Sequence, residues 1–317
     1  SDGSRMINQG HGDSPSNRST KSFYIENLGC AKNQVDAEIL GELFTREGWI
    51  WSEGPEGADL ILINSCGFIR SAKEETIRVT LEMKKNHPGK KVLLTGCFAQ
   101  RYGNSTDRQF REIDGVVGNQ SPGSIVESAE RVMTGSRVVE IPEKNLFYPE
   151  RSRFLSYPGS VYVKIAEGCS NMCSYCAIPL IRGPVESRGS GDIAEEIETY
   201  IRNGAAEIIL LAQDAAAYGS DRGTEENLAA LLRKIDKIPG DYWIRLLYIH
   251  PDHFPGELFE IAAGSSRILP YFDIPFQHAS EPVLKRMGRS GNGDSYLRLI
   301  ERIRNEIPGA VIRSTFL

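Results

Sequence analysis

The feature that most constrains this chain is a group of three cysteines in the spacing C-x3-C-x2-C, at Cys169, Cys173 and Cys176. We call them the loop triad, because they follow a short apolar run at 161–165 that is typical of a β-strand. Three thiolates can hold three irons of a [4Fe-4S] cluster and leave the fourth iron open for chemistry. A zinc loop is the alternative, but zinc usually needs a fourth ligand and none lies nearby in the sequence. The spacing therefore favours an iron–sulfur cluster.

Three further cysteines, Cys30, Cys66 and Cys97, each follow a predicted strand, and we call them the strand-end triad. The predicted strands at 23–25, 58–63 and 91–95 alternate with predicted helices at 33–47, 71–86 and 124–133. Repeated strand–helix units predict an α/β domain with a parallel, doubly wound sheet, whose carboxyl-end loops meet at one edge. We therefore expect these cysteines to converge and to act as ligands. The alternative is three buried, inert cysteines, since free cysteine is often buried.

Strand–helix units resume after residue 158, with strands expected at 161–165, 207–211, 242–248, 268–273 and 310–312. Five such strands predict a partial β/α barrel, because eight are needed to close one. The chain stops directly after the last of them, so we expect the barrel to be truncated at its C-terminus. The predicted divisions are a disordered lead-in at 1–21, an N-terminal domain with the strand-end triad at 22–137, a linker at 138–157 and an incomplete barrel at 158–317.

Composition narrows the functional classes. The 317 residues carry a net charge of −5, which disfavours a dedicated nucleic-acid-binding protein. No apolar run approaches a membrane span, and residues 1–21 lack the apolar segment of a signal peptide. We therefore expect a cytoplasmic protein without a membrane partner. Disulfides are correspondingly not expected, so all six cysteines are free to bind metal.

Several longer motifs resemble a known family. The loop triad with Tyr175 before its last cysteine resembles the radical S-adenosylmethionine enzymes, and the upstream three-cysteine domain narrows this to the methylthiotransferases. Within them, the stretches 28–33, 64–69, 96–102, 178–183, 213–219 and 273–280 resemble the RimO branch. The chain departs from the usual pattern at Ala31, where proline is usual, and at Ala215 and Ala216, where Thr or Ser is usual.

The resemblance implies a transferase that inserts a methylthio group at the β-carbon of an aspartate in ribosomal protein uS12. It implies two [4Fe-4S] clusters and S-adenosylmethionine. The cluster on the loop triad would generate a 5′-deoxyadenosyl radical, and the cluster on the strand-end triad would hold the sulfur. The implied partners are uS12, on or off the small ribosomal subunit, and a low-potential electron donor such as flavodoxin or ferredoxin. The resemblance also leads us to expect that the family's C-terminal TRAM domain is absent and that 158–317 is an incomplete radical SAM core.

Polar residues at strand ends are the remaining site candidates, and no catalytic residue is assigned beyond the cluster ligands. We expect cofactor binding by Tyr175, Gln213, Asp214, Gln277 and Arg313, with a structural hydrogen-bonding role open for each strand-end residue. Arg182 and Arg188, just after the loop triad, could pair with a carboxylate, but surface solvation is the default expectation for both. The His-x2-His pair, His250 and His253, lacks a third ligand, so we do not expect it to bind a metal.

Two alternatives to the leading function remain open. One is the same chemistry on an adenosine of tRNA, as in the related MiaB branch, which the acidic composition disfavours. The other, from a different functional class, is a non-catalytic iron–sulfur protein that transfers electrons. Two clusters with no open iron would serve electron transfer alone.

Overall fold

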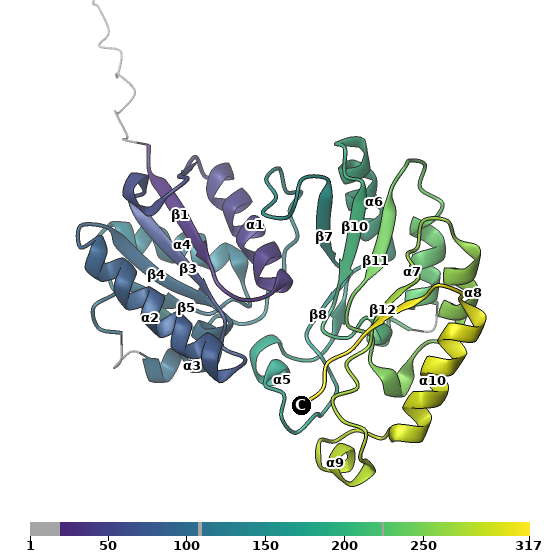
Figure 1. Ribbon diagram of the computed structural model, residues 1–317. Helices are drawn as coiled ribbons and strands as arrows, with labels where there is room; N and C mark the ends of the chain where they lie inside the picture. The colour runs from purple at the N-terminus through teal and green to yellow at the C-terminus, as the bar shows by residue number, and fades with distance from the viewer. Residues whose placement is uncertain (1–19, 107–109, 224) are drawn as a thin grey trace, which may run out of the picture.

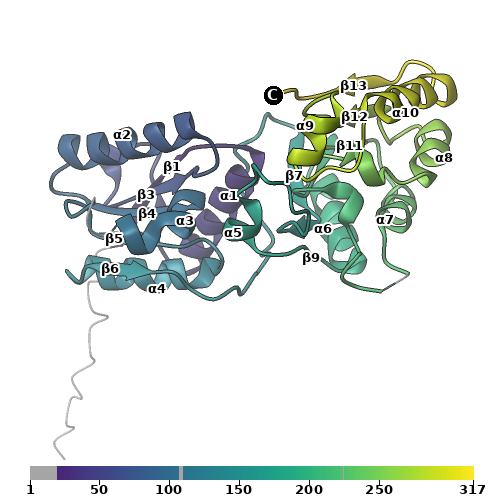
Figure 2. The same cartoon turned by 90° about the horizontal axis from the view of Figure 1, so that it is seen from below.

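The computed structural model describes residues 20–106, 110–223 and 225–317, and almost all of the expected lead-in at 1–21 lies outside them. The chain forms two α/β lobes side by side, an N-terminal domain and a barrel domain (Figures 1 and 2). This confirms the predicted fold class. Among the described residues, no helix is long and apolar enough to cross a membrane.

The N-terminal domain is a six-stranded parallel sheet in the order β2-β1-β3-β4-β5-β6. Its strands are β1 (Ser22–Asn27), β2 (Ile50–Trp51), β3 (Leu60–Ser65), β4 (Lys91–Gly96), β5 (Gly115–Val117) and β6 (Val138–Glu140). Its helices are α1 (Ala31–Arg46), α2 (Arg70–Asn86), α3 (Cys97–Thr106) and α4 (Pro122–Met133), with a 3-10 turn at Pro55–Gly57. The sequence pattern did not reveal the short strands β2, β5 and β6. Strand β6 extends the sheet three residues into the expected linker.

The central strand β3 is buried along its whole length, as expected for a parallel strand covered on both faces. Leu60 and Leu62 face the core that contains α1 and α4, whereas Ile61 and Ile63 face the core with α2 and α3. Asn27 pairs with Asn64, and Ser65 pairs with Gly96. This register brings the carboxyl ends of three adjacent strands level, directly before the three cysteines of the strand-end triad.

The barrel domain has five parallel strands, as predicted. They are β7 (Ser160–Lys164), β10 (Glu207–Leu211), β11 (Trp243–Leu246), β12 (Tyr271–Asp273) and β13 (Val311–Arg313). Strands β7, β10 and β11 form one sheet and β12 and β13 another, joined by a bridge between Ile244 and Ile268. A short antiparallel pair, β8 (Ala166–Glu167) and β9 (Glu186–Ser187), closes the base of the loop that carries the loop triad.

The helices of this domain are α5 (Ile178–Arg182), α6 (Ser190–Arg202), α7 (Leu228–Ile235), α8 (Glu257–Gly264), α9 (Glu281–Arg286) and α10 (Gly293–Glu306), with 3-10 turns at Ala215–Ala217 and Pro251–His253. Helices α6, α7, α8 and α10 lie on the outside of the strands, whereas α5 lies between the two lobes (Figures 1 and 2). Helix α1 lies on the side of the N-terminal domain that faces the barrel, and it contacts β7, while α5 contacts α3 (Figures 1 and 2). These contacts place the two triad-bearing edges opposite each other.

Arg151 fastens the connecting segment to both domains. Its side chain is 2% exposed and forms ion pairs with Glu38 of α1 at 2.5 Å and Glu196 of α6 at 3.0 Å. The guanidinium also donates a hydrogen bond to the Tyr162 carbonyl oxygen at 2.6 Å. A buried charge with partners on both domains can be satisfied only when the domains are docked.

Replacing Arg151 should therefore destabilise the protein much more than replacing its exposed neighbour Arg153. We expect Arg151→Met to lower the free energy of unfolding by about 3–5 kcal/mol, because the buried Glu38 carboxylate loses its ion pair and Glu196 keeps only Arg188. Arg153 pairs with Glu53, which is 85% exposed, so Arg153→Met should cost less than about 1 kcal/mol. Urea unfolding of both variants measures the difference, and equal losses would contradict the docking role of Arg151.

Candidate functional site

The strand-end triad is held together by one buried asparagine, Asn33. The thiols of Cys30 and Cys97 both donate to the Asn33 Oδ1 atom at 3.7 Å. The Asn33 amide donates in turn to the Ser65 carbonyl oxygen at 2.9 Å, next to Cys66. Cysteines that are separated by 36 and 31 residues in the chain thus converge on one point, as the strand-end pattern predicts.

Glycines before the cysteines allow this convergence. Gly96 has φ +90°, in the left-handed region, and a Cβ added there would lie 2.4 Å from the Ser65 nitrogen. Gly29 has φ +113°, and its added Cβ would meet the Cys66 Cβ at 3.0 Å. A side chain at either position would push neighbouring strand ends apart.

The loop triad is fixed by hydrogen bonds to surrounding segments. The Cys169 amide donates to the Gly183 carbonyl oxygen at 3.0 Å, and the Ser174 amide donates to the Met287 carbonyl oxygen at 2.9 Å. Inside the loop, the Asn171 amide group donates to Asp214 Oδ2 at 2.9 Å. The loop is therefore held from three sides before any ligand binds.

Both triads line one cavity of about 510 Å³ between the domains. All six cysteines are free thiols. In the described ranges, no three His, Cys, Asp or Glu side chains are placed to hold a single metal ion. In a [4Fe-4S] cluster each cysteine ligates a different iron, so the ligands of a cluster surround it rather than meet at one ion.

The five expected cofactor-binding residues, Tyr175, Gln213, Asp214, Gln277 and Arg313, all line this cavity. The Asp214 side chain already has hydrogen-bond partners within the protein. Its carboxylate accepts hydrogen bonds from the His250 amide at 3.2 Å and the Ala216 amide at 3.0 Å, besides that from Asn171. It also contacts the His253 Nε2 atom at 2.6 Å. These contacts hold the loop triad in place, which is the structural role left open for this residue.

The other candidates keep polar atoms available to the cavity. Gln213 donates to Glu167 at 2.5 Å, while its Oε1 atom is buried without a hydrogen-bond partner among the described residues. Arg313 is half exposed and pairs with Asp273 at 3.1 Å. Gln277 has φ +69°, which is strained for a residue with a side chain. Such strain is typical of functional sites.

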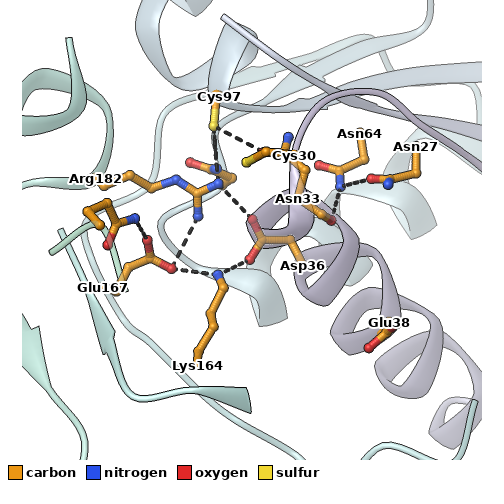
Figure 3. Close-up of polar contacts among 12 residues, drawn as sticks. Asn27, Cys30, Asn33, Asp36, Glu38, Asn64, Cys97, Lys164, Glu167 and Arg182 are labelled. Atoms are coloured by element: carbon orange, nitrogen blue, oxygen red, sulfur yellow. Dashed lines mark hydrogen bonds and ion pairs between the residues drawn. The ribbon is translucent and has the colours of Figure 1, made fainter. Parts of the chain in front are cut away.

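A buried ion network crosses the domain boundary beside the strand-end triad (Figure 3). Asp36 of α1 contacts Lys164 at 2.5 Å and Arg182 at 2.7 Å. Glu167 contacts the same two cations at 2.6 and 3.2 Å. Burial by itself would raise the pKa of Glu167, but Arg182 and Lys164 hold it well below its ordinary value. The network therefore contains two cations and two carboxylates in mutual contact.

Arg182 also donates a hydrogen bond to the Cys97 Sγ atom at 3.1 Å. It lies six residues after Cys176 of the loop triad, so its side chain links the two triads. The expectation that Arg182 is solvated at the surface is wrong, since the residue is 3% exposed. Two carboxylates and a thiol on other segments offer enough partners to bury it. Arg188 likewise pairs with Glu196 at 2.6 Å.

His250 and His253 stack with ring centroids 4.5 Å apart and an interplanar angle of 3°. Burial lowers the pKa of His250 to about 4, which keeps that ring neutral at physiological pH. No group of metal-binding side chains is found around the pair in the described part of the chain. His253 instead supports Asp214.

Sequence reasoning missed two cationic residues that line the cavity, Lys32 and Arg289. Lys32 lies two residues after Cys30, which is a predicted ligand. This proximity in the sequence could have identified it as a site residue. Arg289 lies in a glycine-rich stretch that fails the pattern of a phosphate-binding loop. Only the fold brings Arg289 to the loop triad.

Comparison with known proteins agrees with this architecture. Residues 22–118 match the family described as Uncharacterized protein family UPF0004, and residues 163–317 match the Radical SAM superfamily. The chain is 42% identical to ribosomal protein uS12 methylthiotransferase RimO of Treponema denticola, covering 91% of this chain and 67% of that protein. The protein of the same name from Carboxydothermus hydrogenoformans is 38% identical, with 93% of this chain and 68% of the relative covered. The chain thus spans about two thirds of the length of these relatives.

Two solved structures share the fold at low sequence identity. The radical S-adenosylmethionine methyltransferase TsrM from Kitasatospora setae has a TM-score of 0.63 at 14% identity, with 94% of this chain and 67% of that chain covered. The cobalamin-dependent S-adenosylmethionine radical enzyme OxsB has a TM-score of 0.65 at 10% identity, with 94% of this chain and 49% of that chain covered. At these identities the likeness concerns the fold alone.

The glycine before Cys97 provides a test of the strand-end triad. In Gly96→Ala, the new Cβ collides with β3 and displaces Cys97, so we expect iron after anaerobic reconstitution to fall from about eight to about four atoms per chain. Gly135→Ala is the matched control, because Gly135 also has positive φ, +95°, but open space around its Cβ position. The control should keep its iron and lose only about 1 kcal/mol of stability. Full iron uptake by Gly96→Ala would contradict the role of this strand end.

Proposed function

Since the chain belongs to the RimO family of radical S-adenosylmethionine methylthiotransferases, we propose that it transfers a methylthio group to the β-carbon of an aspartate in ribosomal protein uS12. The observation that carries this proposal is the single cavity lined by both cysteine triads. A radical source and a sulfur source must act on the same carbon atom. Two triads that open into one cavity satisfy this requirement.

The residues present fit two [4Fe-4S] clusters and S-adenosylmethionine. The strand-end triad would hold one cluster and the loop triad the other, with Tyr175, Gln213, Asp214, Gln277 and Arg313 around the cofactor. Within the described ranges, Gln213 Oε1 and Arg289 Nε are buried at this cavity without hydrogen-bond partners. A buried acceptor and a buried donor left unpaired indicate a ligand that supplies their partners. When bound, these groups supply a 5′-deoxyadenosyl radical and a sulfur atom, the chemistry that side chains cannot provide.

The work of the protein is positioning and exclusion of water. Asn33 and the glycines before the cysteines place the strand-end triad, and Asp214 places the loop triad through Asn171. Arg182 sets the two triads relative to each other, because it contacts Cys97 and also the domain-bridging carboxylates. The cavity lies between the lobes, and both of them contribute to its lining.

The partners follow from this activity. A cluster that cleaves S-adenosylmethionine needs an external electron, for which we propose a low-potential donor of the flavodoxin or ferredoxin type. The protein substrate is uS12, free or within the small ribosomal subunit, which favours action in the cytoplasm. A tRNA adenosine remains the alternative substrate, and the net charge of −5 favours the protein substrate over it.

Anaerobic reconstitution tests the activity and the substrate together. We expect about eight irons per chain, for two four-iron clusters, with reductive cleavage of S-adenosylmethionine. Methylthio transfer to a uS12 peptide and to tRNA is then assayed side by side, and transfer to the peptide alone is expected. Transfer to tRNA alone would contradict the proposal that uS12 is the substrate. Two clusters without cofactor cleavage would favour an electron-transfer protein instead.

Cysteine variants separate the two triads. We expect Cys30→Ala to retain cleavage of S-adenosylmethionine but to lose the methylthio product, because only the strand-end triad is damaged. Cys173→Ala is the matched control and should lose both. The measurement is the yield of 5′-deoxyadenosine and of modified peptide, and product formation by Cys30→Ala would remove the strand-end triad from the reaction.

A further inference from the structure

One lysine that lines the cavity forms no ion pair with any residue that the structure describes. Four lysine and arginine side chains line the cavity. Arg182 is paired with Asp36 and Glu167, and Arg313 is paired with Asp273. Lys32, in contrast, has neither a hydrogen bond nor an ion pair to any residue that the structure describes. Its one contact of note is the ring of Tyr248, whose centroid lies 3.8 Å from the Lys32 Nζ atom.

The backbone of Tyr248 is strained in a way that holds this ring under Lys32. Its φ is +62°, and besides Gln277 it is the only described residue other than glycine with positive φ. A bulky residue in this region costs free energy and persists only where the surroundings require it. A lysine over an aromatic face is stabilised without an ion pair, so its N–H donors stay free for another acceptor. Burial lowers the pKa of Lys32, while the charges of Cys30 and Glu167 oppose this effect.

The position of Lys32 relates it to both triads. It belongs to the first turn of α1, two residues after Cys30, whereas Tyr248 follows β11 of the barrel. The lysine side chain therefore reaches from the strand-end triad toward the barrel across the cavity. A substrate group that enters the cavity between the two triads would therefore contact the Lys32 side chain.

We propose that Lys32 binds the carboxylate of the target side chain and thereby selects an acidic residue as the substrate. This inference rests on the proposed function and adds to it the residue that recognises the substrate. In an aspartate, the carboxylate carbon is bonded directly to the β-carbon. A charge-assisted hydrogen bond from Lys32 to that carboxylate therefore fixes the reacting carbon beside the strand-end triad.

Other charged groups in the cavity do not take this role. The Asp273 carboxylate is bound by Arg313, and no ion pair joins it to Lys32 among the described residues. Arg289 also has no carboxylate partner in the described part of the chain, but it donates to the Pro275 carbonyl oxygen at 2.8 Å. It directly follows Gly288, where an added Cβ would lie 2.7 Å from the Met172 carbonyl oxygen, so Arg289 lies beside the loop triad, on the cofactor side. Lys32 is the cation on the sulfur side.

Equilibrium binding of two peptides to the reconstituted protein tests the proposal. The peptides are a uS12 loop peptide with its target aspartate and the same peptide with asparagine at that position, and fluorescence anisotropy reports their Kd. We expect Lys32→Met to weaken binding of the aspartate peptide by about tenfold or more, the size of one charge-assisted hydrogen bond. Binding of the asparagine peptide should not change, and Lys32→Arg should restore the preference for aspartate.

Lys73→Met is the matched control. Lys73 also stacks on a tyrosine, with its Nζ atom 5.6 Å from the Tyr102 ring centroid, but it lies outside the cavity lining. Lys73→Met should bind both the aspartate peptide and the asparagine peptide with the same affinity as the wild type. Iron content and cleavage of S-adenosylmethionine show that each variant is folded and loaded.

The outcomes separate the inference from the proposed function. If the wild type binds and modifies the aspartate peptide but Lys32→Met retains its preference for aspartate, the inference is wrong and the function stands. Equal weakening of both peptides by Lys32→Met also overturns it, because a general packing role would then explain the loss. If the wild type neither binds nor modifies the uS12 peptide, the proposed function itself fails, and the inference with it.

Discussion

The interaction on which the rest of the structure depends is the buried ion network between Asp36, Lys164, Glu167 and Arg182. Removing a charge from water costs several kcal/mol, and burial is tolerated only when each charge has partners of the opposite sign. Asp36 comes from the N-terminal domain and the other three from the barrel domain. The charges are therefore satisfied in one arrangement of the domains, and that arrangement makes the cavity.

The same network connects structure to chemistry. Arg182 uses one nitrogen for Asp36 and Cys97 and another for Glu167, so a movement of either triad changes its contacts. Hydrogen bonds to a sulfur ligand also tune the potential of an iron–sulfur cluster. Burial raises the pKa of the Cys97 thiol, which the adjacent Arg182 opposes. The domain contact thus reaches a proposed cluster ligand directly.

Several irregular features of the described residues lie at the cavity. Tyr248 and Gln277 have strained backbones, and Gln213 and Arg289 keep unpartnered polar atoms there. The cores of both domains follow ordinary packing rules, with apolar faces packed between sheets and helices, although buried polar atoms without a partner among the described residues also occur at Thr95 and Gln100. Local violations of these rules at one place are expected where a protein binds ligands rather than where it only folds.

The sequence by itself determined the fold class and the places of the strand-end triad and the loop triad, because periodicity and spacing are local properties of the chain. It also pointed to the family through motifs that are contiguous in sequence. The two- and three-residue strands β2, β5 and β6 escaped notice, since so short a run has no period to detect. Tertiary structure alone decided that Arg182 is buried, that Asp214 supports the loop triad, and that Lys32 stands unpaired over Tyr248. Each of these depends on partners 15 to 216 residues away, and only folding brings such partners within the few ångströms over which charges and hydrogen bonds act.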